Sequence, residues 1–315
     1  MAAKSKKDDR ALARRVHIRV PASTSNLGPG FDCLGLALTL YNVFVFQPAE
    51  EFSIAIKFKG CDEHDSQTMN GGRNNLVFRA ADEVFRRVGM KLPGLSIKME
   101  VSVPLSRGLG SSATAIIGGV VGANALLGSP LKDDEVFRLI VDLEGHPDNV
   151  TASFHGGLTA AMMCDRVPAF ARYKVAPEVR AVVAIPPYPL STEKARAALP
   201  REVPHADAVH NLTRVPFVIE ALTTGALNLL SCAMDDRLHE PYRVALLRNG
   251  KAIRKAALSA GAAGVAISGA GPTMVAFCHE SQAKAVAEAM KGQMKDGRVE
   301  ILEIAGHGVR TTVKK

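Results

Sequence analysis

A glycine-containing segment between a strand-like stretch and a small-residue helix limits most strongly what this chain can fold into. Residues 95–103 are mostly apolar, residues 103–112 are Val-Pro-Leu-Ser-Arg-Gly-Leu-Gly-Ser-Ser, and we expect a helix from Ser112 to about Leu127. Glycine lets the backbone approach a ligand closely, and a helix N-terminus offers unpaired N–H groups and a partial positive charge. We therefore expect a loop that binds the phosphates of a nucleotide. The simpler alternative is a strand-to-helix turn with a serine cap. The segment is not a Walker A loop, because no Lys-Ser/Thr follows the glycines.

The basic excess of the chain is concentrated at its two ends. The 315 residues carry a net charge of +8. Residues 1–15 hold six basic and two acidic side chains, and residues 309–315 hold three basic ones, which leaves only +1 for the residues between. A nucleic-acid-binding protein is expected to carry its basic excess on a folded face. We therefore expect disordered, solubilising ends at 1–15 and 309–315 and no nucleic-acid partner.

The cysteines and the apolar segments indicate a cytoplasmic protein without a membrane span. The five cysteines, at positions 33, 61, 164, 232 and 278, form no Cys-x-x-Cys pair, which argues against a zinc site or a disulfide framework and fits a reducing compartment. The N-terminal residues lack the apolar stretch of a signal peptide. The uncharged run 108–131 contains six glycines. Its helical part is shorter than the ~30 Å hydrocarbon core of a bilayer, so we expect a buried helix.

The hydrophobic pattern predicts strands and helices mixed without strict βαβ alternation. Strands are expected at 16–20, 42–46, 52–58, 95–103, 158–163, 179–185, 264–267, 273–278 and 299–304. Helices are expected at 75–88, 112–127, 133–143, 204–230, 235–247, 251–260 and 281–290. This order favours an α+β protein of two domains over a doubly wound parallel sheet. The pattern weakens around 165–177, which marks a candidate domain boundary.

Four motifs in the chain have the form found in one enzyme family. They are Pro-Leu-Ser-Arg-Gly-Leu-Gly-Ser-Ser-Ala at 104–113, Pro-Ala-Ser-Thr-Ser-Asn-Leu-Gly-Pro-Gly-Phe-Asp at 21–32, Glu-Gly-His-Pro-Asp-Asn-Val at 144–150 and Ser-Gly-Ala-Gly-Pro-Thr at 268–273. On these motifs the chain resembles the GHMP small-molecule kinases. The motif at 144–150 resembles most specifically the homoserine kinases. The matches occur in the expected order and cover most of the chain.

The resemblance implies a fold and its division. It implies an α+β, two-domain GHMP kinase fold with an N-terminal mixed α/β domain that carries the glycine-rich phosphate loop. The second domain would be ferredoxin-like, with the active site in the cleft between the two. We place the domains at 16–170 and 171–308, flanked by the basic ends 1–15 and 309–315.

The resemblance also implies an activity. A homoserine kinase transfers the γ-phosphate of ATP, with Mg²⁺, to the hydroxyl of L-homoserine and gives O-phospho-L-homoserine and ADP, a step of threonine biosynthesis. Two alternatives remain: a GHMP kinase for a different small alcohol, and a GHMP-fold sensor of nucleotides or metabolites that has lost turnover. Homodimers are common in the family, so the expectation of a homodimer rests on the resemblance alone.

For the nucleotide and the metal, the resemblance implies two sets of residues. Ser112 and Glu144 would hold Mg²⁺, which prefers oxygen ligands and takes few of them from protein. Adenine would lie near Asn75, although the adjacent Asn74 is an alternative counterpart. The residues expected to bind the nucleotide are Asn75, Pro104, Leu105, Ser106, Arg107, Gly108, Leu109, Gly110, Ser111, Ser112, Ala113 and Thr114.

For the acceptor, the resemblance implies a pocket that binds the carboxylate, the ammonium and the hydroxyl of the substrate. Arginine suits carboxylates, and the family-matched candidates are Arg196 and Arg243. Asp32 and Asp148 would bind the ammonium. The remaining residues expected to contact or orient the substrate are Asn26, His146 and Thr192.

The residues expected to act in catalysis are Asn26, His146, Asn149 and Arg196. Mevalonate-type relatives have an aspartate general base where this chain has Asn149, which accepts no proton at neutral pH. We therefore expect direct in-line attack by the hydroxyl, with catalysis by positioning and electrostatic stabilisation. His146 as a general base is the alternative.

Overall fold

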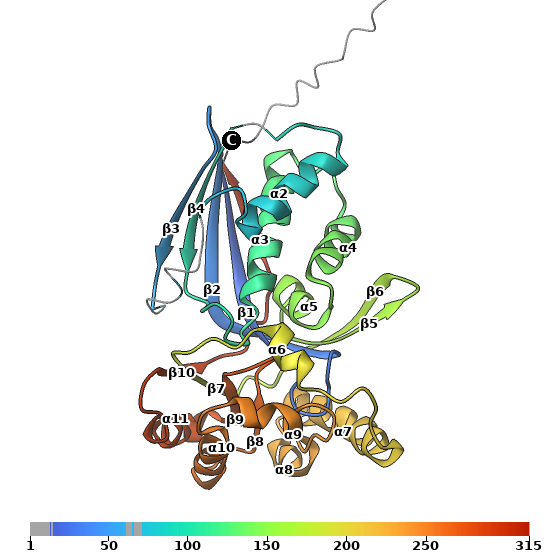
Figure 1. Ribbon diagram of the computed structural model, residues 1–315, viewed down its shortest axis with the longest axis vertical. Helices are drawn as coiled ribbons and strands as arrows, with labels where there is room; N and C mark the ends of the chain where they lie inside the picture. The colour runs from blue at the N-terminus through green and yellow to red at the C-terminus, as the bar shows by residue number, and fades with distance from the viewer. Residues whose placement is uncertain (1–12, 14, 61–64, 66–70, 93, 315) are drawn as a thin grey trace, which may run out of the picture.

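The computed structural model describes residues 13, 15–60, 65, 71–92 and 94–314, which form two sheets with helices packed on them (Figure 1). The larger sheet lies in the N-terminal half and the smaller one in the C-terminal half. Strands and helices follow one another without strict alternation, so the expected α+β class is confirmed.

The N-terminal sheet has seven described strands in the order β11-β1-β2-β4-β3, with the hairpin β5–β6 attached to β2. Only β3 and β4 pair in parallel. Alternate residues of β1 point inward, which places Val16, Ile18 and Val20 in the core. The strands are β1 (Arg15–Ser25), β2 (Leu34–Pro48), β3 (Ser53–Phe58), β4 (Leu95–Val101), β5 (Leu158–Cys164), β6 (Val167–Tyr173) and β11 (Arg310–Lys314).

Helices cover one side of this sheet, and α3 lies at their centre. Almost every residue of α3 is buried, because its glycines allow close packing on both sides. A Cβ on Gly118 or Gly122 would lie 2.5 or 2.3 Å from the rings of Phe44 and Phe46 on β2, and one on Gly119 would lie 2.4 Å from the backbone of α2. The helices are α2 (Leu76–Arg87), α3 (Ser111–Leu126), α4 (Asp133–Glu144) and α5 (Asp148–His155). Within the described part of the chain, no helix is long and apolar enough to cross a bilayer.

The C-terminal sheet has four described antiparallel strands in the order β10-β7-β9-β8. Numbered along the chain this is the order 4-1-3-2 of a ferredoxin-like sheet. The strands are β7 (Val179–Ile185), β8 (Gly264–Ile267), β9 (Met274–His279) and β10 (Arg298–Leu302). The helices are α6 (Thr192–Ala197), α7 (His205–Thr224), α8 (Leu230–Ala233), α9 (Glu240–Arg243), α10 (Gly250–Ser259) and α11 (Ala283–Gly292), with 3₁₀ turns η1 (Leu227–Leu229), η2 (Val244–Leu246) and η3 (Glu280–Gln282).

An apolar core joins the two halves. Leu27, Leu34 and Leu109 from the N-terminal half pack in one cluster with Val183 of β7 and Phe277 of β9. A separate cluster packs the opposite face of the small sheet against α10 and α11. The loops between the two sheets are therefore held on a shared core, and these loops carry the sequence motifs.

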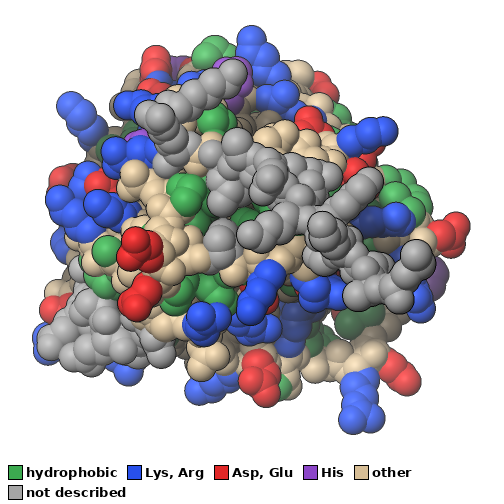
Figure 2. Space-filling view, turned by 90° about the horizontal axis from the view of Figure 1, so that it is seen from above, with side chains coloured by type: hydrophobic (Ala, Val, Ile, Leu, Met, Phe, Trp, Pro, Cys, Tyr) green, Lys and Arg blue, Asp and Glu red, His purple; other side chains and the backbone are tan. Residues whose placement is uncertain are grey.

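The expectation of a disordered C-terminal end is wrong for residues 310–314. They form β11, which pairs antiparallel with β1 from Arg19↔Arg310 to Arg15↔Lys314. The N-terminal sheet therefore takes strands from both ends of the chain, and β6 extends to Tyr173. The domain boundaries at 170 and 308 stay predictions. Residues 1–12, 14 and 315 of the two expected tails lie outside the described residues. Figure 2 shows basic and acidic side chains interspersed over one face of the molecule.

The helix expected at 235–247 is also wrong, because only α9 and η2 form there. The Asp236 carboxylate accepts hydrogen bonds from the backbone N–H groups of Leu238, His239 and Glu240. A side chain thus satisfies donors that a preceding helical turn would have satisfied.

Candidate active site

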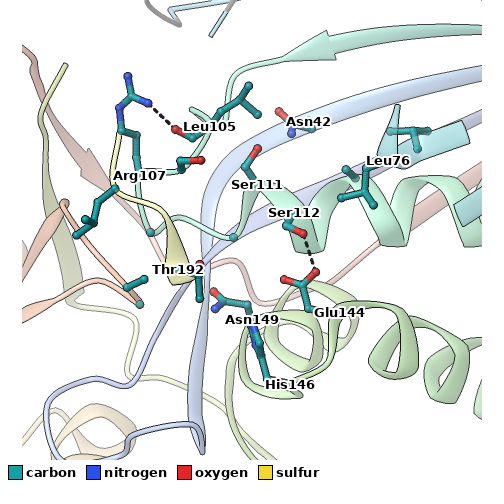
Figure 3. Close-up of a pocket in the computed structure, with 18 of the residues that line it drawn as sticks. Asn42, Leu76, Leu105, Arg107, Ser111, Ser112, Glu144, His146, Asn149 and Thr192 are labelled. Atoms are coloured by element: carbon teal, nitrogen blue, oxygen red, sulfur yellow. Dashed lines mark hydrogen bonds between the residues drawn. The ribbon is translucent and has the colours of Figure 1, made fainter. Parts of the chain in front are cut away.

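A cavity of about 390 Å³ opens between the two halves of the molecule (Figure 3). Its lining combines apolar side chains with hydroxyl, carboxylate, imidazole and amide groups. The lining residues are Asn42, Phe44, Asn74, Asn75, Leu76, Val77, Met99, Leu105, Ser106, Arg107, Gly108, Gly110, Ser111, Ser112, Ala115, Glu144, His146, Asn149, Leu190, Thr192, Gly269, Ala270 and Gly271. The predicted phosphate loop thus forms one wall, and the 268–273 motif another.

The two glycine motifs approach each other so closely that side chains would not fit between them. Gly108 and Gly110 have left-handed backbone conformations, with φ of 72° and 70°. A Cβ on Gly108 would lie 2.1 Å from the Ser268 carbonyl oxygen, and one on Gly110 would lie 2.4 Å from Ser23 Oγ. The Ser268 hydroxyl also donates a hydrogen bond to the Gly108 carbonyl at 2.6 Å. The glycines are therefore needed for space as well as for conformation.

The loop residues divide into those that face the cavity and those that anchor the loop. Leu105, Ser106, Arg107, Gly108, Gly110, Ser111 and Ser112 line the cavity. Pro104, Leu109, Ala113 and Thr114 were also expected to bind the nucleotide, but their side chains are buried outside its lining. Thr114 Oγ1 accepts a hydrogen bond from Asn42 at 2.8 Å. Only the backbone of these four residues remains available to a ligand.

Arg107 is a fully buried strut and not a charge at the solvated rim. Its guanidinium donates to the Pro186 carbonyl at 3.1 Å and to the Pro187 carbonyl at 2.8 Å. It also donates to the Leu105 carbonyl and lies 3.4 Å from Asp65 Oδ1. The side chains of Arg107 and Asp65 are both 0% exposed. Arg107 therefore fixes the phosphate loop to the segment that follows β7.

Ser112 and Glu144, expected to hold Mg²⁺, lie on different helices and meet through their side-chain oxygen atoms. Ser112 lies on the first turn of α3, and Glu144 is the last residue of α4. The Ser112 hydroxyl donates a hydrogen bond to Glu144 Oε2 at 2.7 Å. Figure 3 shows the two side chains pointing toward one another. Burial raises the pKa of Glu144, and the hydrogen bond from Ser112 opposes that shift.

His146 and Asp148 form a hydrogen-bonded pair beside Glu144. His146 Nδ1 lies 2.8 Å from Asp148 Oδ1. This hydrogen bond raises the pKa of His146, while burial acts in the opposite direction. For Asp148, burial would raise the pKa, but the hydrogen bond and charge of His146 outweigh it and the pKa falls. Both shifts favour the ionised pair.

Asn149 is held in the cavity wall by hydroxyl groups of β1. Its Nδ2 donates to Ser25 Oγ at 2.8 Å, and its Oδ1 accepts from Ser23 Oγ at 3.0 Å. Ser153 of α5 donates in turn to the Ser23 hydroxyl at 2.9 Å. The orientation of the Asn149 amide is therefore fixed, and its Oδ1 acts as a hydrogen-bond acceptor.

The four charged residues expected at the acceptor interact with one another, but none of them is among the residues that line the cavity. Arg196 binds Asp32 through two hydrogen bonds of 3.0 and 2.9 Å. Asp148 acts electrostatically on both Arg196 and Arg243. Arg243 is 2% exposed, and burial followed by repulsion from Arg196 lowers its pKa. Two cations and two anions thus lie close to one another.

The comparisons with known proteins agree with this geometry. The family model of the N-terminal domain of GHMP kinases matches residues 75–157, and that of their C-terminal domain matches residues 218–296. A homoserine kinase of Prochlorococcus marinus is 45% identical over 289 residues, which are 89% of each chain. A homoserine kinase of a Synechococcus species is 46% identical over 302 residues, 94% of this chain and 97% of the relative. The chain belongs to the homoserine kinase family of GHMP kinases.

Solved structures show the same fold. The crystal structure of homoserine kinase from Cytophaga hutchinsonii superposes with a TM-score of 0.84 at 25% identity, covering 99% of this chain and 100% of that one. L. major mevalonate kinase, solved with R-mevalonate, has a TM-score of 0.69 at 17% identity over 98% and 99% of the two chains. The two-domain GHMP kinase fold is therefore confirmed.

Asn26 does not line the cavity of this homoserine kinase family member either. Asn26 was expected to orient the substrate, but it is 3% exposed and outside the cavity lining. Its Nδ2 donates to the Gly269 carbonyl at 2.8 Å, and its Oδ1 accepts from the Asp32 N–H at 3.0 Å. Asn26 therefore shapes the loop that presents Asp32.

Sequence reasoning missed several residues of the site. Asn42 accepts hydrogen bonds from the N–H groups of Ser102 and Val103, at the start of the phosphate loop, at 2.8 and 3.0 Å. An asparagine within an otherwise apolar strand was the available signal. Phe44 and Met99 also line the cavity. Asn74 and Asn75 both line the cavity, so the choice between them as the adenine contact stays open.

Proposed function

We propose that the protein transfers the γ-phosphate of ATP to the side-chain hydroxyl of L-homoserine and yields ADP and O-phospho-L-homoserine, a step of threonine biosynthesis. The observation that carries this proposal is the set of charges formed by Asp32, Asp148, Arg196 and Arg243. They interact with one another, and Arg243 also donates a hydrogen bond to the carbonyl of Gly269, whose backbone lies against Gly108 of the loop that suits phosphates. A carboxylate and an ammonium on one small molecule match two cations and two anions.

The nucleotide would lie along the cavity with its phosphates on the 105–112 loop. Backbone N–H groups at the start of α3 and the positive end of its dipole favour phosphate oxygens. The adenine would pack against the apolar side chains of Phe44, Leu76, Val77 and Met99, which line the same cavity.

Mg²⁺ fits the oxygen atoms of Ser112 and Glu144. The described residues contain no group of three or more His, Cys, Asp or Glu side chains that could hold a metal. That arrangement suits Mg²⁺, which takes most of its ligands from water and phosphate. When bound, the ion would neutralise charge on the transferred phosphoryl group. The protein's part is to hold the hydroxyl of Ser112 and the carboxylate of Glu144 2.7 Å apart.

The acceptor would lie near Thr192 and His146, which line the same cavity. Arg196 and Arg243 would bind its carboxylate and Asp32 and Asp148 its ammonium. Arg196 and Asp32 bind each other in this structure, so a zwitterion would replace each partner by a substrate group of the same charge. That exchange preserves the charge balance of the pocket.

The chemical step would proceed without a protein base. The homoserine oxygen forms a bond to the γ-phosphorus as the bond to the bridging oxygen of ADP breaks. The hydroxyl proton passes to a phosphoryl oxygen and then to solvent. Asn149 has no carboxylate to accept it. His146 is the rival base, because Asp148 orients its ring as in other acid–base pairs. A His146→Gln enzyme whose kcat falls by more than about a thousandfold would support that rival, since general base catalysis contributes roughly 10²–10⁴.

We also propose a cytoplasmic homodimer that binds no nucleic acid. The scattered cysteines support the reducing compartment, since Cys33, Cys164, Cys232 and Cys278 are unpaired. The near-zero charge of residues 16–309 argues against a nucleic-acid surface. The dimer rests on family resemblance.

An acceptor panel tests the proposed function. ADP release would be measured with MgATP against L-homoserine, L-serine, mevalonate and galactose. We expect turnover confined to L-homoserine. Turnover on another alcohol would keep the nucleotide site and reject the acceptor assignment. ATP binding without turnover on any of them would favour the sensor.

A further inference from the structure

Arg243 is buried, yet part of its guanidinium is left for a ligand. Its Nε donates to the Ala195 carbonyl at 3.3 Å, and its Nη1 donates to the Gly269 carbonyl at 3.2 Å. Among the described residues, none forms a hydrogen bond with Nη2. A buried cation with one open edge, close to Arg196, requires a group that holds it in place.

His239 is positioned to be that group. It is 0% exposed and lies one helical turn before Arg243. Its Nε2 lies 2.9 Å from the Gly28 carbonyl, and its Nδ1 lies 3.4 Å from Arg243 Nη1. Asp236 Oδ2 is 3.6 Å from Nε2, too far for a hydrogen bond, and accepts instead from the N–H groups of His239 and Glu240.

These partners allow only one form of the imidazole. A carbonyl only accepts and a guanidinium only donates. Nε2 must therefore carry the proton toward Gly28, and Nδ1 must present its lone pair to Arg243. With the proton on Nε2, His239 connects the substrate loop, through Gly28, to Arg243.

Phe31 completes the arrangement from the other side. Its ring stacks on His239 with a centroid distance of 5.1 Å and an interplanar angle of 23°. The guanidinium carbons of Arg243 and Arg196 lie 5.0 and 5.8 Å from its centroid, within the range of a cation–π interaction. One aromatic ring therefore contacts both arginines and the histidine.

We propose that His239, stacked on Phe31, is a positioning residue that sets the specificity of the acceptor pocket for a carboxylate-bearing alcohol by holding the Arg243 guanidinium through its Nδ1 lone pair. This inference rests on the proposed function, because it assigns the geometry of the same pocket. His239 contacts no substrate; it acts through Arg243.

The test compares two alcohols in three enzymes. L-Homoserine and 3-amino-1-propanol share the ammonium and the hydroxyl, but only the first has a carboxylate. His239→Asn keeps an acceptor close to the position of Nδ1, whereas His239→Gln keeps a donor close to the position of Nε2 and removes that acceptor. The quantity measured is the ratio of kcat/KM for the two alcohols, together with the KM for ATP.

We expect His239→Gln to reduce this ratio by about tenfold or more, as the loss of a hydrogen bond to a charged group would. We expect His239→Asn to stay nearer the wild-type ratio, with the KM for ATP unchanged in both. A structural defect would lower kcat/KM for both alcohols by the same factor and leave their ratio unchanged. If His239→Gln fails to fold, Phe31→Leu, at a half-buried position, is expected to lower the same ratio.

An unchanged ratio in His239→Gln, or equal losses in the Asn and Gln variants, would overturn the inference alone. An unchanged ratio in Phe31→Leu would do so where the Gln variant does not fold. A wild-type enzyme that does not prefer L-homoserine would overturn both the inference and the proposed function.

Discussion

At the scale of single residues, Glu144 has an environment that separates a metal ligand from a surface carboxylate. It is half-buried, accepts a hydrogen bond from the Ser112 hydroxyl, and lies beside the His146–Asp148 pair. We expect Glu144→Gln to lower kcat/KM for MgATP by roughly a hundredfold or more, because metal-ion stabilisation contributes several kcal/mol. Initial rates over a Mg²⁺ titration would measure this.

The matched control lies on the same helix. Asp142→Asn also removes a carboxylate from α4, but Asp142 is exposed and only reaches Arg87 at 3.5 Å. It should leave the Mg²⁺ dependence unchanged. A Glu144→Gln enzyme with the wild-type Mg²⁺ dependence would reject the assignment of the metal site.

The pKa of Glu144 gives a pH prediction with a definite sign. Burial raises this pKa in the free enzyme, so protonation begins at a higher pH than for an exposed carboxyl. Only the carboxylate binds Mg²⁺. The Mg²⁺ concentration needed for half-maximal rate should therefore rise as pH falls toward and through that raised pKa, and Glu144→Gln should flatten the dependence. Equal pH dependence in the two enzymes would be contrary to this account.

At the scale of elements, the turn from β4 into α3 depends on contact with the second glycine loop. Gly108→Ala would combine a left-handed φ with a Cβ 2.1 Å from the Ser268 carbonyl. Gly128→Ala, beyond the other end of α3, has a φ of +78° with open space around it. We expect Gly128→Ala to lower the free energy of unfolding by only about 1–2 kcal/mol, the cost of placing an alanine in a left-handed conformation.

We therefore expect Gly108→Ala to lower the free energy of unfolding by more than Gly128→Ala does, and to raise the KM for ATP where the control does not. Denaturant unfolding and ATP kinetics on the two variants measure both effects. Equal losses with an unchanged KM would show that the loop tolerates displacement.

Local sequence predicted those elements that depend on neighbours along the chain. The small-residue helix 112–127 and the strands of the C-terminal sheet could be predicted from periodicity and glycine content, and α3 is indeed buried. Strand β11 was missed, because a short basic end gives no pattern and is ordered by pairing with β1, about 290 residues away. The helix predicted at 235–247 did not form, because the Asp236 carboxylate accepts hydrogen bonds from the backbone N–H groups of His239 and Glu240.

The same distinction holds within the site. The family resemblance predicted that Ser112, Glu144, His146, Asn149 and Thr192 belong to one site, and all five line the same cavity. The sequence could not show that Arg107 donates its hydrogen bonds to the carbonyl groups of Pro186 and Pro187. Nor could it show that Asn26 donates to the carbonyl group of Gly269, because these partners are distant in sequence. Fold-dependent partners decide whether a polar residue in a motif contacts ligand or backbone.

At the scale of the whole molecule, Arg107 joins the phosphate loop to the C-terminal half. Arg107→Met would leave Asp65 and three carbonyl groups without this partner in a buried site. Removing one member of a buried ion pair costs about 3–5 kcal/mol, so a large fall in Tm and a raised KM for ATP are expected. Arg107→Lys should recover part of each.

A surface arginine provides the comparison for this variant. Arg86→Met removes an exposed pair with Glu83 and should leave Tm and KM close to wild type, as exposed pairs contribute little. A Tm for Arg107→Met equal to that of Arg86→Met would contradict the role of Arg107 as a strut between the two halves.

The central claim is that the cavity transfers a phosphoryl group from ATP to the hydroxyl of L-homoserine. Correlated ³¹P–¹H NMR of the reaction with MgATP and L-homoserine tests it directly. The account predicts ADP and a phosphomonoester whose phosphorus couples to the γ-methylene protons of homoserine. Inorganic phosphate as the only new phosphorus product besides ADP, or a phosphate coupled to any other group, would contradict it.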